Sequence, residues 1–173
     1  MHILAIDPGT EQSGYAVLHG DSILCGGTER NEEILQRIDS GEYDLLVVEE
    51  ITYCHRGGFE IMRTAWWGGA FCMRAHMRRR DYALIARNIV KELLLGRTWG
   101  SDAEVTRSLK ALYGETGKRG GLGGLKGHEI AALAAGIAYR ISEKASMFSA
   151  APPSTDKRKR REKPSRKKKR KSL

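Results

Sequence analysis

The sequence predicts an α/β fold built on a five-stranded mixed sheet flanked by helices. In the first 26 residues, tight-turn residues separate three short apolar runs, a pattern typical of three antiparallel strands. A helical pattern follows, and then a continuous apolar run at 44–49, which is typical of a strand buried on both faces. A strand that comes after such a crossover lies parallel to a neighbour in its sheet, so the sheet is expected to be mixed.

Turn chemistry defines the N-terminal strands. The first run, residues 3–7, stops at a proline–glycine pair, which ends a strand and makes a tight turn. The second run is 14–18, and the turn residues 19–22 join it to the third run at 23–26. We therefore expect the first three strands to form a meander.

Apolar residues at helical spacing account for most of the remaining chain. They predict helices at 29–38, 59–79, 89–95, 103–113 and 128–144, with a strand at 82–86 and a glycine-rich loop at 114–127. Ser101 and Glu104 have the spacing of a capping box, which predicts the start of the fourth helix. The second helix, 59–79, is apolar on two sides, so we expect one side to lie in the core and the other at a subunit interface.

Charge divides the chain into two parts. Residues 151–173 hold 12 of the 30 Lys and Arg residues and 2 of the 21 acidic residues, which leaves the preceding part close to neutral. Because the tail has almost no apolar residues, we expect a folded domain at 1–148 and a disordered basic tail at 149–173. A polyanion, nucleic acid before membrane, is the expected partner of the tail. A solubility tail and a localisation signal are the alternatives.

Several classes of protein are excluded by composition. No apolar run reaches the roughly 18–20 residues of a membrane span, and the N-terminus lacks the pattern of a secretory signal. The 3 cysteines form no close pairs, which fits a reducing compartment. We therefore expect a cytoplasmic protein that has no membrane partner.

Asp7 and Glu49 are the main candidates for chemistry. Each ends a buried apolar run, and on neighbouring parallel strands their side chains would stand about 5 Å apart. Two carboxylates that close repel each other unless a cation or proton lies between them, and oxygen ligands of this kind suit Mg²⁺. The alternative is that either acid caps a helix or turn. Glu50 takes the place of Glu49 if the strand register slips by one residue.

Both acids belong to a longer pattern of motifs. It comprises IDPGT at 6–10, SGYAV at 13–17, VVEE at 47–50, WWGGAF at 66–71, NIVK at 88–91 and GHEIAALA at 127–134. In order and spacing the chain resembles the RuvC family of Holliday-junction resolvases over about residues 2–145, and its short segment before residue 44 favours a phage-type member.

The resemblance implies a fold, an activity and an assembly. The fold is ribonuclease-H-like, and the activity is cleavage of four-way DNA junctions by symmetric nicking. The cofactor is Mg²⁺ or Mn²⁺, with two ions expected in each active site. The assembly is a homodimer, here through the 59–79 helix, in the cytoplasm of a bacterium or of a phage-infected host.

The resemblance also assigns roles to residues. It makes Asp7 and Glu49 metal ligands. On the last helix His128 falls at the first ligand position, and Ala131 falls where an aspartate is expected. Alanine binds no metal, so Glu129 is the expected substitute.

The resemblance also allows an alternative alignment of the last helix, and it assigns a role to a lysine on an earlier helix. A shifted register makes Glu129 the aspartate equivalent, with Lys126 as its partner. Lys91 matches a lysine near the scissile phosphate, and the alternative for it is a solvated lysine on a helix. Eight arginines are expected to form a phosphate-binding surface: Arg56, Arg63, Arg74, Arg78, Arg79, Arg80, Arg87 and Arg97.

Two other functions fit the same residues. One is a nuclease for flaps, branched DNA or RNA–DNA hybrids, which keeps the fold and changes the substrate. The other is a non-catalytic junction-binding protein in which Ala131 marks a degenerate site. The second alternative predicts tight, metal-independent binding without cleavage.

Overall fold

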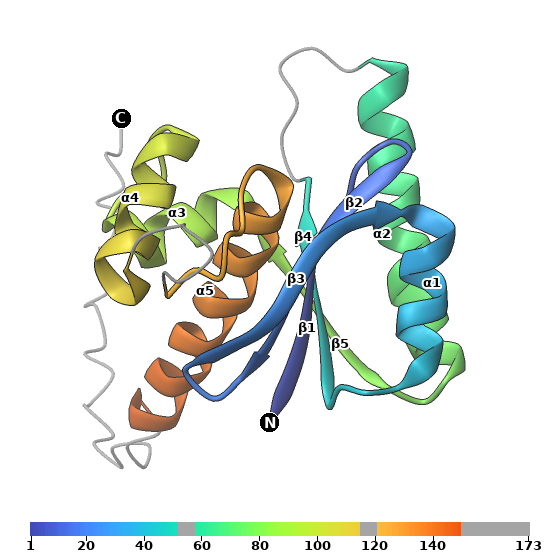
Figure 1. The fold of residues 1–173 in the computed structure, drawn as a ribbon, viewed down its shortest axis with the longest axis horizontal. Helices are drawn as coiled ribbons and strands as arrows, with labels where there is room; N and C mark the ends of the chain where they lie inside the picture. The colour runs from blue at the N-terminus through green and yellow to red at the C-terminus, as the bar shows by residue number, and fades with distance from the viewer. Residues whose placement is uncertain (52–57, 115–120, 150–173) are drawn as a thin grey trace, which may run out of the picture.

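A five-stranded mixed sheet organises the described residues, 1–51, 58–114 and 121–149 of this computed structural model (Figure 1). Its order is β3-β2-β1-β4-β5. The strands are β1 (His2–Asp7), β2 (Gln12–His19), β3 (Ser22–Arg30), β4 (Leu45–Glu50) and β5 (Asp81–Ala86). β1, β2 and β3 are antiparallel, whereas β4 pairs parallel to both β1 and β5. The predicted five-stranded mixed sheet is confirmed.

Helices cover both faces of the sheet (Figure 1). One face packs against α1 (Asn31–Ser40) and α2 (Phe59–Met77). The other packs against α5 (His128–Ser149), with α3 (Arg87–Leu95) and α4 (Asp102–Tyr113) beside it. Within the described ranges no helix is long and apolar enough to cross a membrane. The predicted basic tail lies, from residue 150 on, outside the described residues.

Side chains along the central strands alternate between the two faces of the sheet. This alternation builds a core on each face and decides which face each of the two candidate acids points to. Ile3 and Ala5 pack on the α5 side, whereas Leu4 and Ile6 pack on the α1–α2 side. The residue after Ile6, Asp7, therefore faces the α5 side. β4 alternates in the same phase because Ala5 is paired with Val47.

The boundary between β3 and α1 differs from the prediction. The strand was expected to end at Gly26 and the helix to begin near Glu29, but β3 continues to Arg30 and α1 begins at Asn31. Gly26 is a strand residue at a close approach, since a Cβ there would come 2.8 Å from the Tyr15 carbonyl oxygen and 2.7 Å from Leu125. The glycine marks tight packing and not the end of a strand.

The other predicted helices are confirmed with shifted ends. α2 ends at Met77, two residues early, and α3 begins at Arg87. The capping box of Ser101 and Glu104 is present at the start of α4. α5 continues to Ser149, five residues beyond the predicted end.

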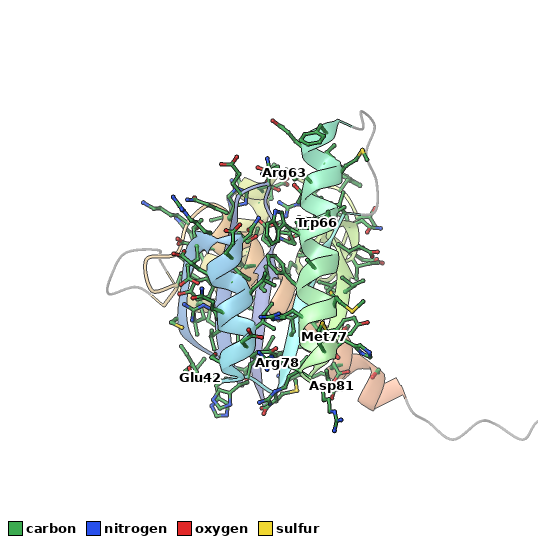
Figure 2. All side chains as sticks on the ribbon, turned by 90° about the vertical axis from the view of Figure 1, so that its right-hand side faces the viewer. Glu42, Arg63, Trp66, Met77, Arg78 and Asp81 are labelled. Atoms are coloured by element: carbon green, nitrogen blue, oxygen red, sulfur yellow. The ribbon has the colours of Figure 1, made fainter. Side chains whose placement is uncertain are left out.

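The helix α2 has two apolar sides, as predicted. Phe71, Cys72 and Ala75 are buried against the sheet and α1. A second set is exposed: Phe59, Met62, Trp66, Met73 and Met77. Figure 2 shows α1 and α2 side by side, with Trp66 and Met77 labelled on α2.

Asp39 of α1 ties the two helices together. It accepts hydrogen bonds from Arg74 and Arg78 at the end of α2, and these bonds lower the pKa of Asp39 to about 2.

Candidate active site

A buried polar network fixes the turn that follows Asp7. Ser13 and Asn31 are fully buried. The Ser13 hydroxyl donates to Asn31 Oδ1 at 2.6 Å and accepts from the Gly9 backbone N–H at 3.1 Å. The Asn31 side-chain amide donates to the Gly9 carbonyl at 3.1 Å. Because β1 runs directly into this turn, the network holds Asp7 at the end of the strand.

A cavity of about 540 Å³ lies where β1 and β4 end. Its ionisable lining residues are Asp7, Glu49, Arg87, Lys91, Asp102 and His128. Its apolar lining includes Val90, Val105, Ile130, Ala131 and Ala134. The cavity therefore combines charged groups of both signs with apolar walls, as is common in binding sites.

Asp7 pairs with His128 in this cavity. The distance from His128 Nδ1 to Asp7 Oδ2 is 2.7 Å, and the Asp7 side chain is 15% exposed. Burial raises the pKa of Asp7, and the contact with His128 opposes that rise. α5 can begin here because Gly14 of β2 has no side chain: a Cβ on Gly14 would lie 2.3 Å from the His128 carbonyl group.

Glu49 is the most buried of these charged groups, at 5% exposure. Its Oε1 accepts from Arg87 Nη1 at 2.6 Å, whereas its Oε2 is buried with no hydrogen-bond partner among the described residues. Burial, and then the nearby Asp7 carboxylate, raise the pKa of Glu49 to about 7. Arg87 opposes that rise. A buried acceptor without a partner is costly, so the position favours a cation or a proton.

Arg87 and Asp102 belong to the site although neither was predicted there. Arg87 Nη2 donates to Asp102 Oδ1 at 2.7 Å, and Lys91 Nζ lies 4.0 Å from the same oxygen. Arg87 was predicted as a surface phosphate contact, and Asp102 was assigned no role. The sequence offered one signal for Arg87, which is that this residue directly follows the β5 strand. The C-terminal ends of the parallel strands β1, β4 and β5 lie at the same edge of the sheet.

The structure does not bring Glu129 to the cavity. Glu129 Oε2 accepts from the Lys126 backbone N–H at 3.0 Å, and Oε1 accepts from Thr28 at 3.3 Å, so this carboxylate caps the start of α5. Ala131 lines the cavity, where it offers no ligand. Glu50 is exposed at the end of β4. The structure thus brings together Asp7, Glu49, Lys91 and His128.

The predicted surface arginines are mostly held in ion pairs. Arg63 pairs with Glu11, Arg97 with Glu104, and Arg74 and Arg78 with Asp39. Arg56 lies outside the described residues.

The side chains of the cavity include the ligand types that a hard divalent cation takes. In the described part of the chain, no three His, Cys, Asp or Glu side chains are grouped closely enough to hold a metal ion as they stand. Asp7 is engaged by His128, and Glu49 by Arg87. The unpartnered Oε2 of Glu49 still offers an oxygen ligand beside Asp7. The residues that would hold a cation are therefore Asp7, Glu49 and His128.

Two solved structures share this architecture. Thermus thermophilus RuvC superposes with a TM-score of 0.65 and 19% identity, over 84% of this chain and 97% of that chain. This chain has the fold of RuvC. T. thermophilus RuvC in complex with a Holliday junction substrate gives a TM-score of 0.67 and 18% identity, over 84% of this chain and 96% of that chain.

The RuvC likeness confirms the ribonuclease-H-like fold class and the resemblance on which it was predicted. The sequence matches no family model and none of the curated proteins. Assignment to a phage-type subclass stays a prediction.

Proposed function

We propose that the chain is a metal-dependent, structure-selective DNA endonuclease that resolves four-way junctions by symmetric nicking. The observation that carries this proposal is the pair of acids, Asp7 and Glu49, that lie near the ends of adjacent parallel strands of a RuvC fold and line one cavity. Lys91 and Arg87 supply positive charge in the same cavity. Metal-assisted phosphodiester hydrolysis requires acidic residues that bind the metal and cationic residues that bind the phosphate, and this cavity has both.

The chain's own residues have separable tasks in this chemistry. Asp7, Glu49 and His128 would hold Mg²⁺ or Mn²⁺, which when bound activates water and neutralises charge on the phosphate. His128 orients the Asp7 carboxylate through its ring nitrogen. Lys91, whose side chain is 19% exposed, donates from the cavity wall to a phosphate oxygen. The apolar walls limit water around these groups, which strengthens their electrostatic interactions.

A homodimer through α2 would place two such cavities on one junction. The exposed apolar side chains of α2 recur at intervals of three, four and seven residues and so follow one side of the helix. A stripe of this kind on an otherwise folded chain is typical of a subunit contact. A two-fold axis then presents one site to each of two opposed strands, which supports paired nicks.

A non-catalytic junction-binding protein is the second candidate. Ala131 leaves the α5 side of the cavity without a carboxylate, and Arg87 engages Glu49. Both features would weaken metal binding. This candidate predicts junction binding that is equally tight with and without Mg²⁺ or Mn²⁺.

The test is cleavage of a labelled synthetic four-way junction in Mg²⁺ and in Mn²⁺. A linear duplex, a flap and an RNA–DNA hybrid are assayed beside it. We expect paired nicks in the junction alone, lost in Asp7→Asn and kept in Asp81→Asn, which makes the same change at the exposed start of β5. Preferential cleavage of the flap or the hybrid would reassign the substrate. Binding without cleavage in both metals would favour the non-catalytic candidate.

A further inference from the structure

The guanidinium of Arg87 joins two carboxylates across the cavity. Nη1 donates to Glu49 at 2.6 Å and Nη2 to Asp102 at 2.7 Å. The two acids differ sharply in environment, since the Glu49 side chain is 5% exposed and the Asp102 side chain 73% exposed. Arg87 therefore spans the cavity from its buried acid to its solvent-exposed rim.

The Arg87 guanidinium on Oε1 neutralises part of the Glu49 charge that a bound metal ion would otherwise neutralise. It lowers the pKa of both Glu49 and Asp7 against the effect of burial, so it carries part of the neutralisation that two close acids need. A divalent cation bound to Glu49 would take over that neutralisation. It would also repel the guanidinium at short range.

The rim of the cavity offers Arg87 a second position. Asp102 holds the other edge of the guanidinium, and Lys91 lies 4.0 Å from the same Asp102 oxygen. Arg87 and Lys91 are four residues apart on α3, so both side chains project from one side of that helix. Two cations tethered by one exposed carboxylate form an anion-binding arrangement at the cavity mouth.

We propose that Arg87 is a second phosphate-binding residue of this cavity, beside Lys91. A divalent cation displaces it from Glu49, and it then binds the scissile phosphodiester together with Lys91 while Asp102 keeps it at the rim. A planar guanidinium with five donors suits bidentate contact with a phosphate. This inference rests on the proposed nuclease function and adds a competition between one arginine and the metal for Glu49.

The competition is tested without DNA, by titrating Mn²⁺ into the metal-free protein in a calorimeter. Arg87→Gln removes the competing charge, so its Mn²⁺ affinity should rise about tenfold over that of the wild type. Arg87→Lys keeps the charge and should stay near the wild-type affinity. Arg107→Gln, an equal loss of charge at an exposed position of α4, should leave the affinity unchanged. An Arg87→Gln affinity equal to or weaker than the wild type's would make Arg87 a structural partner of Glu49 and overturn the competition.

The phosphate contact is tested in saturating Mn²⁺, where differences in metal affinity no longer matter. Single-turnover cleavage of the junction should slow by about 100-fold in Arg87→Gln and by less in Arg87→Lys. A wild-type rate in Arg87→Gln would overturn the contact. If the wild type cuts no junction, the proposed function fails, and the contact is decided by junction affinity, which Arg87→Gln should weaken. Melting temperatures check that each variant folds, and Arg87→Met, which also removes the charge, carries both tests if Arg87→Gln does not fold.

Discussion

At the scale of single residues, Glu49 makes stability depend on pH. Its pKa is about 7 in the folded protein and 4.5 ordinarily, so the folded chain keeps a proton that the unfolded chain releases between these values. The free energy of unfolding of the metal-free protein should therefore fall as pH rises from about 4.5 to about 7, by up to about 3 kcal/mol. Glu49→Gln cannot release a proton and should remove this loss.

Denaturant unfolding between pH 4.5 and 7.5 measures the effect. The gap in free energy between Glu49→Gln and the wild type should widen in favour of the variant as pH rises. The pKa of about 7 already includes the attraction of Arg87, so the slope of this gap against pH is the readout. A pH-independent gap would show that Glu49 titrates near its ordinary value.

The two central acids were predictable from the sequence, whereas their partners were not. Asp7 and Glu49 each end an apolar run, and strand alternation is strict enough to place both on one face. Arg87 and Asp102 start separate helices, and their meeting depends on how α3 and α4 pack. Glu129 was expected as a ligand, but its position next to the start of α5 makes it a cap. An acid near a helix start can cap the helix or bind a metal, and the spacing of residues in the sequence does not decide between these two roles.

At the scale of elements, the start of α5 is set by its close approach to β2. A Cβ on Gly14 would meet the backbone of His128 at 2.3 Å, and backbone atoms cannot rotate away as a side chain can. Gly14→Ala should therefore cost about 1–3 kcal/mol of unfolding free energy and move His128 away from Asp7. Gly69→Ala is the matched control, because nothing lies within 4 Å of its added Cβ.

Thermal melting compares the two glycine variants directly. Gly69 lies inside α2, so alanine there should leave stability unchanged or raise it by up to about 1 kcal/mol. A Gly14→Ala protein as stable as the wild type would mean that α5 does not approach β2 so closely. In that case the placement of His128 would need revision.

The same contacts explain which element boundaries the sequence could not predict. Gly26 was taken as a strand end because glycine is a common breaker. In the fold it is the residue that lets Leu125 approach β3. By contrast, the start of α4 was predicted correctly, because its capping box lies within four consecutive residues. Local signals were sufficient where the cause is local and failed where the cause is a contact distant in sequence.

At the scale of the whole molecule, the proposed homodimer depends on the exposed side of α2. Trp66 lies on this side and is 64% exposed. If two copies pair through it, Trp66→Glu would bury a charge without a partner and should dissociate the dimer. Sedimentation velocity should show the wild type as a dimer and Trp66→Glu as a monomer. Leu24→Glu, an equal change at an exposed position of β3, should remain dimeric. A monomeric wild type would contradict the proposed interface.

The distribution of charge along the chain predicts how the proposed nuclease binds DNA. Residues 151–173 carry 12 basic and 2 acidic side chains, whereas the preceding part is close to neutral. Binding that depends on a basic segment releases counterions from DNA, so it weakens with salt in proportion to the phosphates contacted. A chain that ends at residue 150 should therefore bind the junction more weakly at low salt.

Fluorescence anisotropy with a labelled junction, from about 50 to 200 mM salt, measures both affinity and salt dependence. The shortened chain should show a shallower slope of log affinity against log salt, because each lost phosphate contact removes about 0.9 from the slope. Single-turnover cleavage at saturating protein should stay at the wild-type rate, since the cavity lies wholly within the remaining residues. An unchanged slope would show that the basic segment does not contact the DNA. The cations of the folded part, Arg87 and Lys91 among them, would then have to account for binding.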